Sequence, residues 1–206
     1  MSHLLDGRFF GEAFVTLFVI MDPAGTVPVF LALTAGRSGK SKARSSWQAV
    51  LVSLGVISSF AVFGQAILDY LGIGIPALQG AGGLLLLLVA LQLLTGQAEE
   101  PGQVQDVNIA MVPLGTPLLA GPGAIVATIV FVRRADGVPQ IVALAVAIIA
   151  VHVTLYLFLR YSGVIIRVVR DSGIVLVTRI AGLLLSAIAV QLVASSVLGF
   201  IAAARH

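Results

Sequence analysis

Six long apolar runs follow one another along the chain, and short segments that hold most of the charged residues separate them. A run of about 20 predominantly apolar residues is long enough to cross the hydrocarbon core of a bilayer as an α-helix. The predicted membrane spans are residues 9–33, 48–69, 75–94, 108–132, 140–159 and 180–203. The pattern therefore predicts an all-α polytopic membrane protein with six transmembrane helices in a single membrane domain, residues 1–206.

The composition leads to the same class of protein, because 59% of the residues are hydrophobic, 10% are charged and the mean hydropathy is +1.09. The longest connections, 34–47, 95–107 and 160–179, are too short for a soluble catalytic domain, so the function has to reside at membrane depth. The chain has no cysteine and no HExxH or GxSxG motif. We therefore expect neither an enzyme nor a bound metal or other cofactor.

The distribution of basic residues predicts the orientation in the membrane. Eight of the twelve Lys and Arg residues lie in the connections that follow odd-numbered spans, namely Arg37, Lys40, Lys42, Arg44, Arg160, Arg167, Arg170 and Arg179. By the positive-inside rule these connections are cytoplasmic, and both termini are then external. The basic segments lack interleaved aromatic residues, so we expect no nucleic-acid partner.

An internal repeat appears when the chain is compared with itself at an offset of 99 positions. At this offset Gly83 aligns with Gly182, and Pro23 aligns with Pro122. The comparison predicts a first repeat at about 9–94 and a second at about 108–203, joined by a cytoplasmic loop at 95–107. Because each repeat holds an odd number of spans, the second crosses the membrane in the opposite sense, as in many secondary transporters with inverted repeats.

The aligned prolines predict a broken helix in the first span and another in the fourth. Proline is favoured at the first helical position, and Asp22 is a good cap immediately before Pro23. Gly121-Pro122 is the corresponding restart in the second repeat. The two half-helices would point their N-termini at the membrane midplane from opposite leaflets, where they would attract an anion. Asp22 adds a carboxylate at that depth, and such a residue normally faces a cavity or pathway.

A zwitterion fits this arrangement, because its carboxylate can meet the helix N-termini while its ammonium pairs with Asp22 or with carbonyls freed by the breaks. The residues expected to bind the substrate are Asp22, Pro23, Gly25, Thr26, Thr116, Gly121, Pro122 and Gly123. Asp22 and His152 are the candidates for ion coupling, since imidazole titrates near physiological pH. The alternatives are that Asp22 only caps its own half-helix and that His152 is a hydrogen-bonded packing residue.

Three motifs resemble the MarC family of bacterial inner-membrane proteins: residues 22–30 (DPAGTVPVF), 113–117 (PLGTP) and 121–125 (GPGAI). The resemblance covers nearly the whole chain and implies six spans, a bacterial inner-membrane location and a relation to the LysE-type exporter superfamily. It also implies transport of small neutral amino acids such as alanine and glycine. Where the family motif has Asn, this chain has Thr26, which keeps a hydroxyl group but loses the amide.

The sequence thus favours a secondary transporter or exporter of small neutral amino acids that works by alternating access at a midplane site. The expected partners are a small zwitterionic substrate and membrane lipid, while the oligomeric state stays open. A channel-like pore for small solutes and a lipid-headgroup translocase are the alternatives. An intramembrane enzyme using Asp22 with His152 is disfavoured, because no second acid or metal-ligand cluster accompanies them.

Overall fold

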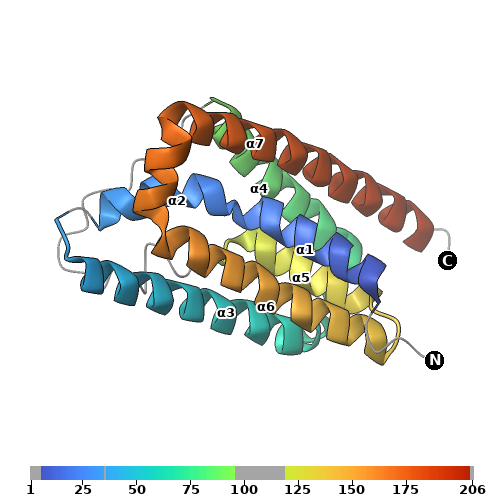
Figure 1. Ribbon diagram of the computed structural model, residues 1–206. Coiled ribbons are helices and arrows are strands. Elements are labelled where there is room, and N and C mark those ends of the chain that lie inside the picture. Colours follow the sequence, from blue (N-terminus) through green and yellow to red (C-terminus); the bar gives the residue numbers. More distant parts are fainter. Residues whose placement is uncertain (1–5, 35, 96–118, 205–206) are drawn as a thin grey trace.

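The computed structural model describes residues 6–34, 36–95 and 119–204, and every regular element in these ranges is a helix. The helices, shown in Figure 1, are α1 (Gly7–Met21), α2 (Pro23–Leu33), α3 (Gly39–Tyr70), α4 (Ile75–Thr95), α5 (Pro122–Arg134), α6 (Val138–Arg160) and α7 (Ser162–Ala203). The predicted all-α class is confirmed for the described residues.

Five segments of the described chain are long and apolar enough to cross a membrane. They are Gly7–Leu31, Gly39–Tyr70, Ile75–Thr95, Val138–Arg160 and Ser172–Ala203. These segments correspond to five of the six predicted spans. The remaining predicted span, 108–132, lies partly outside the described residues, as does most of the predicted loop 95–107, and α5 is the part of that span that the structure describes.

The predicted connection at 160–179 is wrong, because this segment is almost entirely helical. α6 ends at Arg160, α7 begins at Ser162, and α7 continues for 42 residues. In Figure 1 the first turns of α7, in orange, run across one end of the bundle before the helix bends into its longer red part. Hydropathy marks only the part of a helix that lies in hydrocarbon, and the charged residues before it are compatible with a helix that extends further.

The second helix likewise begins earlier than predicted. α3 starts at Gly39, after Ser38, whose hydroxyl accepts a hydrogen bond of 3.3 Å from the Ser41 amide as an N-cap. Much of the predicted connection 34–47 is therefore helical. Lys and Arg are good helix formers, so the helix persists beyond the apolar run that the hydropathy pattern detects.

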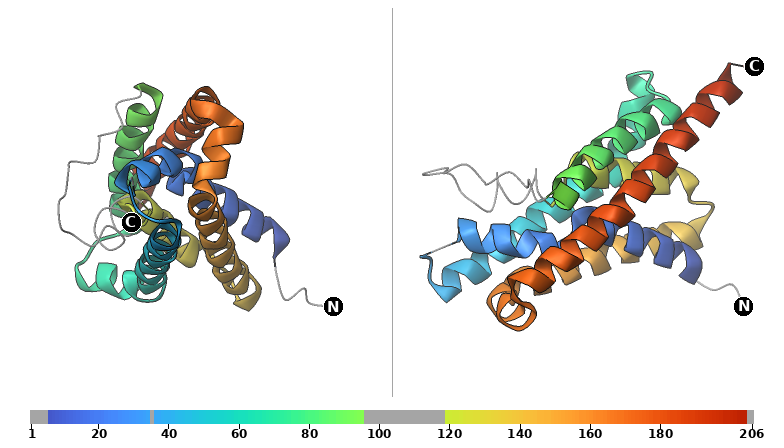
Figure 2. Two further views of the ribbon diagram at one scale, coloured as in Figure 1. Left: turned by 60° about the vertical axis from the view of Figure 1, so that its left-hand side comes forward. Right: turned by 90° about the horizontal axis from the view of Figure 1, so that it is seen from above.

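The helices pack in two groups. α4 and α7 lie antiparallel and in contact along much of their length, as both views in Figure 2 show. α1, α2, α3, α5 and α6 share a larger apolar core, in which the ring of Phe9 meets that of Phe131 edge to face at 5.7 Å. Many large apolar side chains stay exposed on the outer surface, among them Val62 and Leu198. Such a surface is stable in lipid and would be unfavourable in water.

Glycines allow the close approach of α4 and α7. A Cβ on Gly83 would lie 2.8 Å from the carbonyl oxygen of Ala189, and a Cβ on Gly182 would lie 3.3 Å from the carbonyl oxygen of Ala90. Small residues at such positions are the usual means by which membrane helices come into backbone contact. Gly83 and Gly182, which align in the internal repeat, therefore both lie at the α4–α7 contact.

We expect Gly83→Ala to lower the melting temperature of the purified protein by several degrees, because the added methyl group meets a backbone carbonyl that cannot turn away. Overpacking of this kind costs about 1–3 kcal/mol. The control is Gly55→Ala, since a Cβ on Gly55 has nothing within 4 Å and alanine is the better helix former. Equal melting temperatures for the two variants would contradict the close α4–α7 contact.

Candidate functional site

The first apolar segment is interrupted at Asp22, between the end of α1 and the start of α2. Asp22 has φ of 37° and is the one non-glycine residue with positive φ in the described chain. Pro23 has no amide hydrogen and disfavours a right-handed helical conformation at the residue before it. The left-handed conformation of an aspartate is a small store of backbone strain, which is typical of functional positions.

Two side chains at the interruption form hydrogen bonds with backbone groups of the first turn of α2 and of Asp22. The Gly25 amide donates to Asp22 Oδ1 at 3.1 Å, so one oxygen of the carboxylate caps α2. The buried hydroxyl of Thr26 donates to the Asp22 carbonyl oxygen at 2.7 Å. The capping alternative therefore accounts for Oδ1, and the Thr26 hydroxyl is turned back onto its own helix.

The second carboxylate oxygen, Asp22 Oδ2, is buried and has no hydrogen-bond partner among the described residues. The hydroxyl oxygen of Thr178, on α7, is in the same situation. The two atoms lie near each other, since a Cβ on Gly25 would clash with Asp22 Oδ2 and lie 3.3 Å from Thr178 Oγ1. Buried polar atoms without partners are rare, and a pair at one place indicates a position where another polar group binds.

A cavity of about 480 Å³ lies beside Asp22, and Thr178 is not among the residues that line it. It is lined by Phe18, Val19, Asp22, Ala24, Phe158, Ile165, Val169, Ile174, Val177, Ile180, Ala181 and Leu184. One wall comes from the interrupted helix α1–α2, and the other comes from the end of α6 and the bent first part of α7. The cavity thus separates residues of the first predicted repeat from residues of the second, and Asp22 is its one polar lining residue.

The second predicted restart lies at the beginning of α5. Pro122 is the first residue of α5, and Gly121 is its N-cap without a side-chain hydrogen bond. Gly123 is buried: a Cβ there would clash with Leu86 of α4 and would lie 3.4 Å from Ile20 Cγ2 of α1. The start of α5 is therefore packed close to the α1–α2 interruption. Thr116 lies outside the described residues.

His152 joins α6 to α3. Its Nδ1 lies 2.8 Å from the Ile148 carbonyl oxygen, and its Nε2 lies 3.1 Å from Ser53 Oγ. Because a carbonyl can only accept, Nδ1 carries the hydrogen and Nε2 accepts from the Ser53 hydroxyl. Neither hydrogen bond goes to Asp22, so this geometry describes helix packing, and ion coupling by His152 stays a prediction.

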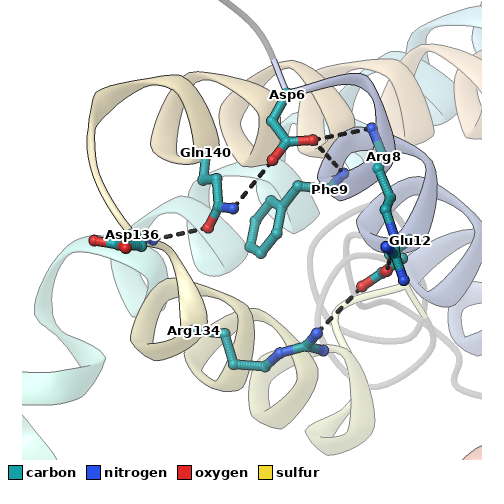
Figure 3. A network of polar contacts seen from close by, with 7 residues as sticks. All are labelled: Asp6, Arg8, Phe9, Glu12, Arg134, Asp136 and Gln140. Atoms are coloured by element: carbon teal, nitrogen blue, oxygen red, sulfur yellow. Dashed lines mark hydrogen bonds and ion pairs between the residues drawn. The ribbon is translucent and has the colours of Figure 1, made fainter.

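Polar contacts close the end of the bundle that carries the α5–α6 turn, as Figure 3 shows. Asp6 caps α1 and accepts a hydrogen bond of 3.0 Å from the Gln140 amide, and Arg134 pairs with Glu12 at 3.2 Å. The amide of Phe9 and the side chain of Gln140 hold the pKa of Asp6 below its usual value. Each of these contacts from Asp6 or Glu12 to α5–α6 joins the two predicted repeats.

A further ion pair at this end joins Arg133 of α5 to Asp69 of α3 at 2.8 Å. Sequence reasoning missed all these pairs, because charged residues at span ends are expected in any membrane protein. It also missed Thr178, which falls in the segment expected to be a loop. Within the described chain, no group of three His, Asp or Glu residues could hold a metal ion.

The fold and the site define an integral membrane protein with a cavity between two groups of apolar helices. The model of the MarC family of integral membrane proteins matches residues 7–201. A UPF0056 membrane protein of Methanocaldococcus jannaschii is 36% identical over 204 residues, 95% of this chain and 98% of its own length. UPF0056 membrane protein YhcE of Escherichia coli is 32% identical over 208 residues, 97% of this chain and 96% of its own length.

The chain belongs to the MarC family, also described as UPF0056. Another relative, a UPF0056 membrane protein of Archaeoglobus fulgidus, is 37% identical over 194 residues, 90% of each chain. No solved structure matches this chain significantly. The family membership confirms the resemblance found in the three sequence motifs.

We expect Thr26→Val to destabilise the protein by about 1 kcal/mol, because the hydroxyl hydrogen bonds to the Asp22 and Met21 carbonyl oxygens are lost while the Asp22 carbonyl keeps the Thr26 amide at 3.1 Å. Thr26→Ser, which keeps the hydroxyl, should unfold close to the wild-type temperature in the same detergent. Thermal unfolding of both purified variants measures the difference. A stable Thr26→Val protein would mean that the hydroxyl is free for another role.

Proposed function

We propose that this protein is a secondary transporter of small neutral amino acids that works by alternating access. The observation that carries the proposal is the unpartnered carboxylate oxygen of Asp22 at an interrupted helix, beside a cavity that lies between the two halves of the chain. A charged residue inside a membrane segment normally serves a pathway or a ligand. The choice of small neutral amino acids comes from the family resemblance.

Contacts between residues 99 positions apart support an architecture of two inverted repeats. Ser53 and His152, which align in the repeat, hydrogen-bond to each other across a separation of 99 positions. Equivalent residues that touch lie on a two-fold axis relating the halves. The contact of Gly83 with Ala189 has its counterpart in the contact of Gly182 with Ala90, as a two-fold relation requires.

The directions of the two restarted helices support the same architecture. α2 and α5 both begin with proline near the middle of the bundle, and in Figure 1 they run toward opposite ends of it. The sequence predicts one broken helix in each repeat. Inverted repeats with broken helices and a midplane site are common among secondary transporters.

Different groups of the site bind the two charged ends of a zwitterion. The ammonium group pairs with Asp22 Oδ2 and the Thr178 hydroxyl, which are buried and have no hydrogen-bond partner within residues 6–34, 36–95 and 119–204. The carboxylate goes to the N-terminus of α5, where Gly121 provides no side-chain cap. Asp22 also serves as the proton carrier, taking up a proton when the ammonium leaves.

The polar contacts at the α5–α6 end form the closed gate of this cycle. They join the first half to the second through Glu12–Arg134, Asp69–Arg133 and Asp6–Gln140. By the distribution of basic residues this end is external, in a bacterial inner membrane with both termini outside. The structure then corresponds to a state that is closed to the outside.

We expect Asp22→Asn to abolish gradient-driven uptake of alanine in proteoliposomes, because the variant can neither carry the proton nor pair with an ammonium as an ion. The protein should still fold, as judged by its melting temperature. The wild type should show saturable, stereoselective counterflow. Undiminished driven uptake by the variant would contradict the role of Asp22, and linear, unsaturable flux by the wild type would favour a pore.

We expect loss of the closing ion pairs to open the α5–α6 end. Spin labels at Ile73→Cys and Val138→Cys, in a chain without native cysteine, report the distance between the two turns. Adding Glu12→Gln and Asp69→Asn should increase the long-distance population by up to about thirtyfold, since exposed pairs contribute about 0–1 kcal/mol each.

The matched control for this experiment is Arg8→Gln, which removes an ion pair of 3.3 Å to Glu12 within α1 and leaves the contacts between the halves in place. Its distance distribution should equal that of the unmodified labelled protein. If the double variant also keeps a single short distance, the ion pairs do not form a gate.

A further inference from the structure

The cavity beside Asp22 opens onto the outer surface of the helix bundle. Three of its lining residues on α7, Val177, Ile180 and Leu184, are 45%, 52% and 48% exposed. They belong to the membrane-length segment Ser172–Ala203, and the opposite wall is the interrupted helix α1–α2. In a bilayer, the opening of this cavity of about 480 Å³ therefore faces lipid hydrocarbon.

The walls of the cavity offer almost no polar surface. Asp22 is the one polar lining residue, and its oxygen Oδ2 is buried away from the cavity. A bound water molecule needs about two to four polar partners, so water is poorly held here. An empty cavity would forfeit dispersion contacts along both walls. An apolar chain from the surrounding lipid fills this space at the lowest cost.

Basic residues lie at the end of the cavity where α6 meets α7. Arg160 ends α6, two positions after the lining residue Phe158. Arg167 lies in the first part of α7, between the lining residues Ile165 and Val169. Both arginines are exposed, and the three ion pairs among the described side chains all lie at the opposite, α5–α6 end. A phosphate from outside the chain can supply the counter-charge at this corner.

The direction of α7 places this corner at the membrane surface. In Figure 1 the first turns of α7 run across the end of the bundle, and they carry the exposed residues Val164 and Val168 beside Arg167. A helix of this composition lies in the headgroup region of a bilayer. By the distribution of basic residues this surface is cytoplasmic, where anionic lipids attract Lys and Arg. The arginines are then at headgroup depth, and the cavity extends from them toward Asp22.

We propose that an anionic phospholipid of the cytoplasmic leaflet binds at this corner. Its phosphate pairs with Arg160 and Arg167, and one acyl chain enters the cavity and ends beside Asp22. A second copy of the chain, related by a two-fold axis, would instead bring the same arginines against one another. The inference does not depend on the proposed transport, because Asp22 Oδ2 and the Thr178 hydroxyl are not part of the cavity surface.

Native mass spectrometry of the purified full-length protein tests the headgroup, after reconstitution in nanodiscs of equal parts phosphatidylcholine and phosphatidylglycerol. The wild type should retain a single phospholipid, predominantly phosphatidylglycerol. Arg160→Gln with Arg167→Gln should lower this preference by up to about thirtyfold, because each basic residue near an anionic surface contributes about fivefold. Arg8→Gln, at the other end, should leave it unchanged. Equal retention of both lipids by the wild type, or an unchanged preference in the double variant, would overturn the proposal.

A pair of variants on α7 tests the position of the acyl chain. Ala181 lines the cavity, whereas Ala187 is exposed on the same helix. Ala181→Leu should reduce the lipid-bound fraction at least tenfold, and Ala187→Leu should leave it unchanged. Phosphatidylglycerol added in detergent should raise the melting temperature of the wild type and of Ala187→Leu, and leave that of Ala181→Leu as it is.

If Ala181→Leu does not fold, Ala24→Val narrows the cavity from its opposite wall and should have the same effect. Equal lipid retention by a folded cavity variant and by Ala187→Leu would overturn the assignment of the cavity. Recovery of the wild type as a lipid-free dimer would mean that a second copy covers the opening, which would also overturn the proposal.

Discussion

The backbone of Pro23 imposes the constraint on which the site depends. Proline cannot donate a hydrogen bond and restricts the residue before it, so α1 ends at Met21 and Asp22 takes a left-handed conformation. This places a carboxylate at the interruption, with Oδ1 used to cap the next helix and Oδ2 left over. A continuous helix through this position would hold neither the cap nor the unpartnered oxygen.

Two kinds of contact hold the halves of the chain around this interruption. Glycines bring α4 and α7 into backbone contact, where dispersion forces are the main attraction that a lipid environment leaves available. Polar contacts also join the halves, namely the Ser53–His152 hydrogen bond inside the bundle and the Glu12–Arg134 ion pair at one end. The cavity lies where neither kind of contact joins the halves, which is where a ligand could be enclosed and released.

Much of this organisation could be predicted from the sequence, because it follows from local chemistry. Hydropathy identified the five membrane-length helices, and Asp22-Pro23 marked the interruption. The helical segment at 160–179 could not be predicted from hydropathy, since the pattern does not register a helix that continues outside hydrocarbon. Thr178 was missed for the same reason, and its position opposite Asp22 depends on the bend of α7, which no local pattern encodes.

The direction of the Thr26 hydroxyl and the cavity itself also depend on three-dimensional packing. A threonine near a break can face a ligand or its own backbone, and here its hydroxyl donates to the Asp22 carbonyl oxygen, which also accepts from the Thr26 amide. The apolar lining comes from residues distributed over α1, α2, α6 and α7, most of which resemble any other lipid-facing residue in sequence. The substrate class could not be read from such a distribution.

Protection of a single cysteine tests most directly whether the ligand binds between Asp22 and Thr178. Thr178→Cys in the cysteine-free chain should react with a small thiol reagent in proteoliposomes, and saturating neutral amino acid should slow the reaction at least tenfold. Val62→Cys, on the exposed outer surface, should react equally with and without the amino acid. A Thr178→Cys reaction rate that the amino acid leaves unchanged, in protein that still transports it, would contradict the account.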